Sequence, residues 1–140
     1  MDHEGTIEEL GRDECLTRLA TQRLGRLGVV VDGVPLVLPM RFILDGDTVV
    51  LQTNQGAKVL HGPMASVSFE VDHVDWEKGV GWSVLVQGIG EDISSAIDER
   101  SEALRSLTVH SWAPPPADRW LKIIPRKITG RLIRAGSPDT

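Results

Sequence analysis

The order of apolar and polar positions along the chain is dominated by the period of a β-strand. From residue 24 onward, short segments rich in β-branched and apolar residues are separated by glycine-containing turns, which is typical of antiparallel strands joined by hairpins. Asp32-Gly33 and Asp45-Gly46-Asp47 are the strongest turn signals, because aspartate and glycine tolerate the backbone angles of tight hairpin turns. The pattern predicts strands over Leu27–Val31, Val34–Leu44, Thr48–Thr53, Ala65–Val71, Trp82–Ile93 and Leu121–Ile133.

Helical periodicity occurs in only a few segments. Thr6–Ala20 spaces its apolar residues as one helical face would, so the sequence predicts an N-terminal helix over about residues 6–20. Ser95–Leu107 also has a helical period, and one or two helical turns fit Ala57–His61. About six strands joined mainly by hairpins, with helices at the periphery, predict a mainly β, α+β antiparallel barrel that spans residues 1–140 as a single domain with a loose tail over about 136–140.

Length and composition place the chain among ordinary soluble domains. Its 140 residues suffice for one apolar core, and no apolar run approaches the roughly 20 residues that a membrane-spanning helix needs. The acidic start of the chain lacks the features of a secretory signal, and the single Cys15 cannot form an internal disulfide, so we expect a cytoplasmic protein with a buried thiol. The net charge of −5 repels the phosphate backbone of nucleic acids, which argues against a nucleic-acid partner.

One segment has the chemistry of an anion site. In Thr53-Asn54-Gln55-Gly56-Ala57-Lys58 a strand ends in polar residues, a glycine allows close approach to the backbone, and a lysine opens a short helix. Unpaired amides at the start of a helix carry partial positive charge, and Lys58 adds a full charge. The segment is therefore a candidate phosphate site, and an ordinary helix start with a solvated lysine is the alternative interpretation.

The chain resembles the pyridoxamine 5'-phosphate oxidase superfamily in the order of several short motifs. Thr53-Asn54 and Lys58 match the strand end and the lysine that this family places at a flavin phosphate. Val37–Phe42 corresponds to the preceding strand of the family, whose backbone amides and carbonyls line the flavin ring. The remaining matches are Ser83–Gly88, which fits a later strand of the form x-V-x-V-x-G, and Trp120 with Arg131, which fit a tryptophan and an arginine that reach the flavin of the other subunit.

This resemblance implies a six-stranded split β-barrel that forms a homodimer, with FMN or the deazaflavin F420 at the subunit interface. If a flavin is bound, Arg41 or Arg131 is suited to stabilise the reduced, anionic ring, and Met40, Trp112 or Trp120 to wall it. The residues that the resemblance implies at the cofactor are Leu38, Pro39, Met40, Arg41, Gln52, Thr53, Asn54, Gly56, Lys58, Ser83, Trp112, Trp120 and Arg131.

The sequence departs from the true oxidases in two places. Ala57 stands where they have an arginine before the lysine, and the chain lacks the C-terminal Arg-Leu-His-type segment with which they hold pyridoxal phosphate. We therefore do not expect oxidation of pyridoxamine phosphate. The resemblance is closer to the small general branch that includes nitroimidazole-reductase-like and F420-binding proteins. It implies an oxidoreductase for a small planar acceptor such as a nitro compound or quinone, or a non-catalytic module that holds flavin or haem.

Metal and hydrolase chemistry have weaker support. Glu70, Asp72, His73 and Asp75 form the only dense cluster of metal-ligand residue types in the sequence. Because strand alternation puts neighbouring side chains on opposite faces, we expect a solvated strand end there and no metal site. Ser83 lacks the closing glycine of a nucleophile elbow, which argues against a serine hydrolase.

Histidine and tryptophan positions leave further alternatives open. His61 and His110 fit either exposed positions or places near a substrate. Trp76 is expected to fill core or interface space, as large aromatic side chains generally do. Trp112 and Trp120 flank a proline-rich loop, so we expect both at the subunit interface.

Overall fold

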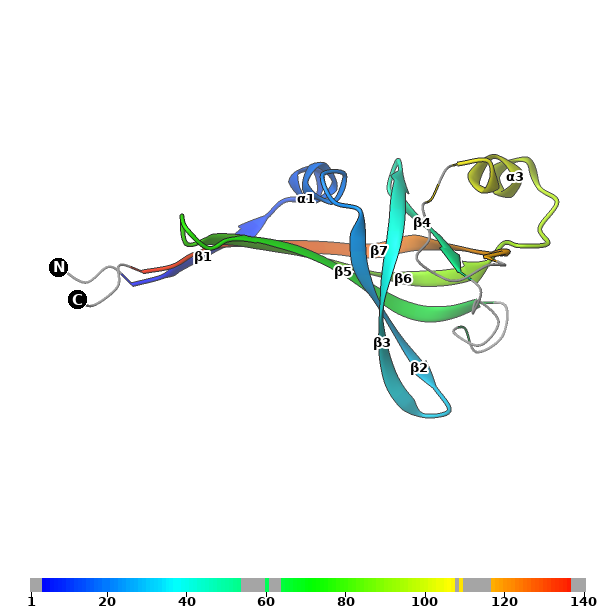
Figure 1. Ribbon diagram of the computed structural model, residues 1–140, viewed down its shortest axis with the longest axis horizontal. Coiled ribbons are helices and arrows are strands. Elements are labelled where there is room, and N and C mark those ends of the chain that lie inside the picture. The colour runs from blue at the N-terminus through cyan, green and yellow to red at the C-terminus, as the bar shows by residue number, and fades with distance from the viewer. Residues whose placement is uncertain (1–3, 54–59, 61–63, 108, 110–116, 137–140) are drawn as a thin grey trace.

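The computed structural model describes residues 4–53, 60, 64–107, 109 and 117–136 (Figure 1). Its strands follow one another mostly through tight turns, as the aspartate-glycine pairs predict. Asp32 and Gly33 both have positive φ angles, of 50° and 76°, as a tight hairpin turn between two twisted strands requires. The elements are β1 (Thr6–Leu10), α1 (Arg12–Leu19), β2 (Leu24–Val31), β3 (Val34–Asp45), β4 (Thr48–Thr53), β5 (Met64–Asp75), β6 (Val80–Asp92), α3 (Glu99–Arg105) and β7 (Arg119–Arg134).

All strands of the described residues belong to one antiparallel sheet that closes on itself. The sheet order is β1-β7-β4-β3-β2-β5-β6, and an additional pairing of β7 with β6 closes the ring. The 16-residue β7 makes this closure possible, because it pairs with β4 near its start, with β6 over most of its length and with β1 at its end. The predicted split-barrel fold is confirmed, with seven strands in place of six.

The barrel is split between β3 and β4. These strands pair only from Phe42 to Asp45 on the β3 side, whereas β2 pairs with β3 from Val34 to Arg41. Among the described residues no strand covers the other edge of this part of β3. The β2–β3 hairpin therefore projects from the barrel body (Figure 1), and its free edge leaves backbone amides and carbonyls available to a ligand.

Apolar side chains fill the barrel and a smaller space under α3. Phe69 is fully buried and meets Phe42 edge to face, with 5.0 Å between the ring centroids. The four residues from Thr48 to Leu51 on β4 are all buried, because one face of this strand joins the barrel core while Val50 packs with Ile93 and Leu104 beneath α3. Because both faces of β4 are buried, this strand has a continuous apolar run instead of a strict alternation.

The predicted helix over residues 6–20 is wrong in its first part. Residues Thr6–Leu10 form β1, which pairs with Gly130–Arg134 of β7. This end of β7 extends past β4, so its backbone groups on that edge need a partner, and Ile7 stays 65% exposed on the added strand. The helix begins only after Gly11, and its buried Cys15 and Leu19 pack into the core. Cys15 is buried as predicted, and this burial raises the pKa of its thiol.

Other helix predictions are partly corrected. The helix expected over Ser95–Leu107 is shorter, because Asp98 caps its start by accepting a hydrogen bond from the amide of Ser101. The segment 57–59, the proline run at 114–116 and the tail from 137 lie outside the described residues. No described helix is long and apolar enough to cross a membrane.

Trp76 is not part of the core of this chain. It lies in the turn between β5 and β6 with 86% of its surface exposed. Asp75 closes this turn by accepting a hydrogen bond from the amide of Lys78, and Gly79 supplies a positive φ angle. The turn geometry directs this tryptophan to solvent, which corrects the expectation that it fills core space in this chain.

Candidate functional site

Four of the predicted cofactor residues form two groups along β7, each made of one residue of β7 and its partner on a neighbouring strand. Ser83 of β6 is the direct register partner of Arg131, and Gln52 of β4 is the direct partner of Trp120. Within each pair the partners are far apart in the sequence, so the sheet brings them together. The two groups are eleven residues apart along β7, which corresponds to roughly 35 Å of extended strand.

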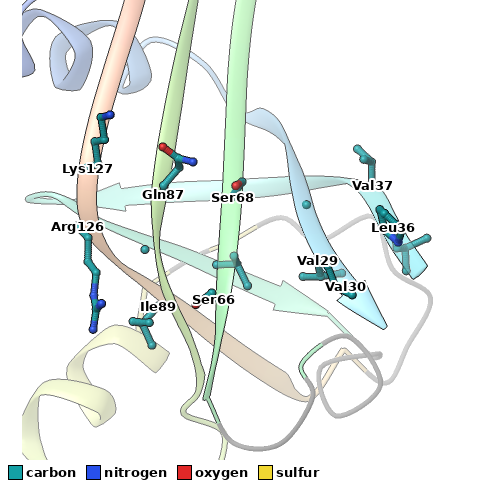
Figure 2. A pocket seen from close by; sticks show the side chains of 14 residues that line it. Val29, Val30, Leu36, Val37, Ser66, Ser68, Gln87, Ile89, Arg126 and Lys127 are labelled. Carbon is teal, nitrogen blue, oxygen red and sulfur yellow. The ribbon is translucent and has the colours of Figure 1, made fainter. Parts of the chain in front are cut away.

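A concave surface on the outside of the sheet contains the first group. A pocket of about 700 Å³ is lined by Ser83 and Arg131 together with Gln87 and Lys127. A neighbouring pocket of about 470 Å³ is also lined by Gln87 and Lys127, and it extends to Val37 on the β2–β3 hairpin (Figure 2). We call these two connected pockets the outer groove. Each volume lies within the range of ordinary small-molecule sites.

A β-bulge aims two cations into the outer groove. Gln87 is opposite Lys127, but Gly88 is opposite Pro125, so Arg126 has no partner on β6. In a regular strand two consecutive side chains point to opposite faces, whereas at a bulge they point to similar sides. The bulge thus explains why Arg126 and Lys127 both line the 470 Å³ pocket. It also accommodates Pro125, which has no amide to contribute to the ladder.

The predicted residues of β3 are divided between the core and a third pocket. Leu38 and Met40 pack against the barrel core, and Pro39 is the exposed register partner of Arg26. Arg41 lines a separate pocket of about 360 Å³ beside α1. Within one chain, none of these four side chains lines either pocket of the outer groove. Strand alternation accounts for this division, because it puts Leu38 and Met40 on one face of β3 and Pro39 and Arg41 on the other.

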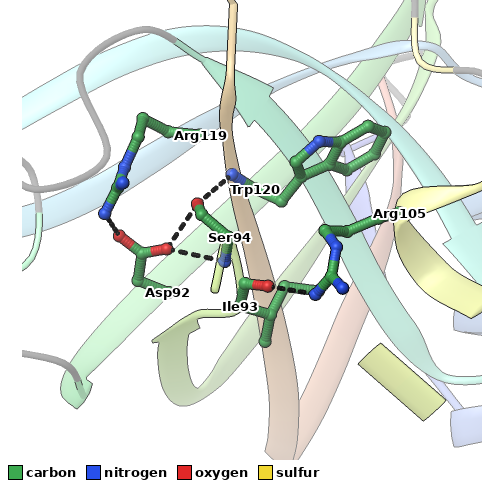
Figure 3. Close-up of polar contacts among 6 residues, drawn as sticks. All are labelled: Asp92, Ile93, Ser94, Arg105, Arg119 and Trp120. Atoms are coloured by element: carbon green, nitrogen blue, oxygen red, sulfur yellow. Dashed lines mark hydrogen bonds and ion pairs between the residues drawn. The ribbon is translucent and has the colours of Figure 1, made fainter. Parts of the chain in front are cut away.

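The second group is held by a hydrogen-bond network at the start of β7 (Figure 3). Asp92 accepts hydrogen bonds from the amide and hydroxyl of Ser94 at 2.9 and 2.6 Å and pairs with Arg119. The Ser94 hydroxyl oxygen accepts a bond of 2.8 Å from the amide of Trp120. These contacts fix the backbone beside Gln52, whose side-chain amide donates to the carbonyl of Ala117. Thr53, next along β4, is buried.

A pair of carboxylates lies beside the outer groove. Arg26 donates to Glu70 at 3.1 Å and to Asp72 at 3.0 Å, and Glu70 lines the 700 Å³ pocket. Desolvation by burial, followed by the hydrogen bond and the charge of Asp72, raises the pKa of Glu70 to about 7, against the lowering effect of Arg26. At neutral pH this side chain therefore remains protonated in part of the molecules, which reduces the negative charge facing the groove.

This raised pKa predicts a loss of stability as pH increases. Between pH 4.5, the ordinary pKa of a glutamate, and about pH 7, the native chain keeps the proton of Glu70, while the unfolded chain releases it. The free energy of unfolding should therefore fall as pH rises through this window. Glu70→Gln cannot release a proton and should remove much of that decline in urea titrations at several pH values. A matched variant at the exposed β5–β6 turn, Glu77→Gln, should retain the wild-type slope. The same pH dependence of the unfolding free energy in all three proteins would contradict the raised pKa of Glu70.

Several predicted residues lie outside the described part of the chain. The residues outside the described part are Asn54, Gly56 and Lys58 of the expected phosphate segment, together with Trp112, His61 and His110. Their proposed roles thus rest on the sequence alone. Thr53, the last described residue of β4, is the register partner of Arg119.

Sequence reasoning missed the residues that line most of the outer groove. The predicted cofactor residues did not include Gln87 and Lys127, which line both of its pockets, or Arg126 and Glu70, which each line one. The available signal was Pro125 inside a long predicted strand, because a proline there usually marks an edge or a bulge. A bulge predicted at this proline would have placed the side chains of Arg126 and Lys127 on the same side of the strand.

Comparison with known proteins agrees with this architecture. Residues 11–132 match the family model described as pyridoxamine 5'-phosphate oxidase. This chain belongs to the pyridoxamine 5'-phosphate oxidase family. The matched region includes both groups of predicted residues and all of the outer groove except Glu9 and Leu10.

Several bacterial proteins are similar to this chain over most of its length. An uncharacterised protein of Mycobacterium tuberculosis is 29% identical over 94% of this chain and 88% of its own length. A Corynebacterium glutamicum crystal structure named for pyridoxamine 5'-phosphate oxidase has a TM-score of 0.76 and 29% identity, covering 91% of this chain and 98% of that one. The FAD-binding protein of Mycobacterium smegmatis has a TM-score of 0.72 and 30% identity, covering 89% of this chain and 98% of that one.

Proposed function

We propose that this member of the pyridoxamine 5'-phosphate oxidase family is a flavin-dependent oxidoreductase that binds the FMN moiety of its cofactor in the outer groove. One observation carries the proposal. The family resemblance implies Ser83 at a flavin and Arg131 at the flavin of the other subunit. Because the two residues are register partners that line the same 700 Å³ pocket, we place both at one flavin in this proposal. That pocket has the size and the mixed polar and apolar wall of a small-molecule site.

The residues of this pocket fit a flavin. Arg131 and Lys127 are exposed and form no ion pair with any residue that the structure describes. Gln87 and Thr129 add hydrogen-bonding groups, and Leu85 adds an apolar surface. A bound flavin would supply the electron or hydride transfer itself. In this role Arg131 would orient the ring edge and stabilise negative charge on it, since the two charges attract most strongly where water is excluded.

The distance between the two groups supports a homodimer. Trp120 and Arg131 lie roughly 35 Å apart along one strand, too far for one flavin ring to contact both in a single chain. A symmetric pair of subunits would bring the Gln52 and Trp120 end of one copy to the Ser83 and Arg131 pocket of its partner, and would repeat the arrangement at the second site. Thr53, Asn54, Gly56 and Lys58 would then hold the flavin phosphate from the opposite subunit.

The free edge of β3 offers a further contact for the ring in this arrangement. Because β4 pairs with β3 only from Phe42 to Asp45, the edge from Val34 to Met40 has backbone groups that no described strand pairs with. Such groups suit the amide and carbonyl positions of a flavin pyrimidine ring. Arg41 and Met40 lie at the end of this edge, where the cofactor of a dimer would meet them.

The FAD-binding relative from Mycobacterium smegmatis favours a flavin as the cofactor. F420 is the alternative, in which case the chain would be a deazaflavin-dependent reductase. The acceptor we propose is a small planar molecule, such as a nitro compound or a quinone, that stacks on the exposed face of the ring. A non-catalytic module that stores flavin or holds haem is the second class of function, and a lack of turnover with every acceptor would favour it.

A spectroscopic titration tests the cofactor assignment. The purified protein is titrated with FMN, and separately with F420 and haemin, while absorbance and size-exclusion mass are recorded. We expect perturbed flavin bands and one flavin per subunit of a dimer. Oxidation of the reduced cofactor by added acceptor would then establish the enzyme. If no flavin or deazaflavin changes its spectrum, the proposed function is wrong.

Arg131→Ala is expected to weaken FMN binding by about tenfold, because a charged hydrogen bond is worth roughly 1.5–3 kcal/mol. Fluorescence quenching of FMN measures the dissociation constant. Arg134→Ala is the matched control, since Arg134 lies three residues further along β7, is exposed and lines neither pocket of the groove. Equal FMN affinity of the two variants would remove Arg131 from the site.

A further inference from the structure

The wall of the 700 Å³ pocket contains a carboxyl group on the side opposite β7. Glu70 of β5, Leu85 of β6 and Thr129 of β7 all line this pocket and are direct partners in one row across the three strands. Adjacent strands are about 4.8 Å apart, so Glu70 and Thr129 lie roughly 10 Å from each other, on either side of Leu85. A flat ring that rests on Leu85 would have Glu70 along one edge and Arg131 of β7 along the other.

The carboxyl group of Glu70 is held in place from β2. Arg26, the register partner of Glu70 on that strand, donates to Glu70 at 3.1 Å and to Asp72 at 3.0 Å. Of these two carboxylates, only Glu70 lines the 700 Å³ pocket, while Asp72 lines a neighbouring pocket of about 360 Å³. The side chain of Glu70 is 34% exposed. Glu70 is therefore fixed in position and still within reach of both a ligand and water.

The environment of Glu70 allows this side chain to carry a proton at neutral pH. Desolvation by burial and the neighbouring Asp72 raise its pKa to about 7, against the lowering effect of Arg26. Strand β6 adds only uncharged side chains to the wall of the 700 Å³ pocket. The other charged residues that line this pocket or the neighbouring one are Glu9, Arg26, Asp72, Lys127 and Arg131. A carboxyl group with a pKa near the working pH can both release and regain a proton, as a general acid must.

Glu9 is the other carboxylate of the 700 Å³ pocket, and its position suits this role less well. It is exposed on the edge strand β1, where its register partner is Arg131. No described strand covers the outer edge of β1. Glu70 lies between two paired strands and is the carboxyl group that the fold holds over the sheet.

We propose that Glu70 is the general acid of this oxidoreductase and protonates a quinone acceptor that stacks on the flavin. This inference rests on the proposed function. A quinone that takes a hydride, two electrons with one proton, from the reduced flavin becomes a hydroquinone anion and needs one more proton. Glu70 supplies that proton: its O–H bond breaks as the second O–H bond of the hydroquinone forms. Water at the open side of the pocket then returns a proton to the carboxylate, and the flavin is left oxidised.

Reoxidation of the full-length, flavin-loaded protein tests this role in a stopped-flow experiment. The anaerobically reduced protein is mixed in mildly acidic buffer with benzoquinone, which needs a proton, or with ferricyanide, which accepts electrons alone. Glu70→Gln should slow reoxidation by benzoquinone about 100-fold, the size of a general-acid contribution, and change reoxidation by ferricyanide by less than about twofold. Glu77→Gln, the exposed control in the β5–β6 turn, should match wild type with both acceptors.

A carboxyl titration gives a readout that does not depend on turnover. In carbon NMR spectra, the glutamate carboxyl signal that is missing from Glu70→Gln should titrate in wild type with a midpoint at about pH 7. Addition of FMN should raise this midpoint, because a ligand that excludes water from the pocket disfavours the charged carboxylate. A midpoint that bound FMN leaves unchanged would show that Glu70 does not face the flavin, and would overturn the proposal.

The kinetic outcomes separate this inference from the proposed function. Equal losses with benzoquinone and ferricyanide, or an unchanged rate with benzoquinone in Glu70→Gln, would overturn the role of Glu70 and leave the flavin assignment standing. Failure of the protein to bind any flavin would overturn the proposed function and this inference with it.

The pH profile of the wild-type protein decides the question if Glu70→Gln does not fold. The ratio of the benzoquinone rate to the ferricyanide rate should fall by about tenfold per pH unit above about pH 7, as Glu70 loses its proton. Taking the ratio cancels any titration of the flavin itself. A ratio that stays constant across this range would overturn the proposal.

Discussion

Replacing Gly88 by alanine is expected to lower the free energy of unfolding by about 3 kcal/mol. An added Cβ would lie 2.9 Å from the Cα of Pro125, and it would approach the carbonyl oxygen of Ile124 even more closely. Both are backbone atoms of the bulged part of β7, so no side-chain rotation relieves the overlap. Relief would require β6 and β7 to separate where the bulge holds Arg126 and Lys127 in the outer groove.

Urea unfolding followed by circular dichroism measures this loss. Gly28→Ala, on β2, is the matched control, because its added Cβ would meet only Ser68, at an ordinary contact distance of 3.7 Å. We expect that change to stay within about 1 kcal/mol of wild type. A Gly88→Ala protein as stable as Gly28→Ala would contradict the bulge geometry.

Replacing Asp92 by alanine is expected to cost about 2 kcal/mol of stability, the next largest effect. Only 13% of this side chain is exposed, and its removal leaves the Arg119 guanidinium without its ion pair and Ser94 without two hydrogen bonds. The Nε atom of Arg119 is already buried with no partner among the described residues. Asp118→Ala, at an exposed neighbouring aspartate, should have little effect.

The contribution of Asp92 should also depend on pH in a defined direction. Burial raises the pKa of Asp92, but hydrogen bonds from Ser94 and the ion pair with Arg119 outweigh it and hold the pKa below its ordinary value of 3.8. A carboxyl group whose pKa is lowered in the folded state stabilises the fold at pH values above its ordinary pKa. This stabilisation is lost as the pH falls through the pKa of the folded state. The stability difference between wild type and Asp92→Ala should therefore shrink in acid. A constant difference from neutral to strongly acidic pH would show that packing alone is responsible.

Much of the barrel could be predicted because its signals are local. The turn at Asp32-Gly33 and the alternation on either side of it specify the β2–β3 hairpin, whose pairing from Leu24 to Arg41 is regular. The strand from Trp82 differs by only a few residues from the observed Val80–Asp92. β1 was missed because five residues with mixed polarity carry no strong period, and their structure depends on the uncovered edge of β7.

The candidate site was predictable only in its parts. Motif order indicated Ser83, Trp120 and Arg131, and the structure shows Ser83 and Arg131 paired in one pocket. Trp120 lies far from both of them along β7. Motif order could not show this separation, because the distance between two residues depends on whether the segment between them is an extended strand.

The alternation of apolar residues, the turn dipeptides and the family motifs were sufficient to establish an antiparallel barrel and the family to which it belongs. The tertiary structure alone decided the shape of the outer groove. Along β7 the buried positions are Leu121 and Ile123 before the bulge and Gly130 and Leu132 after it, so the inward-facing phase shifts by one residue. A one-residue shift reverses the face of every later side chain, and it depends on whether the partner strand has room at Gly88. That contact lies between residues far apart in the sequence, and it determines which cations line the outer groove.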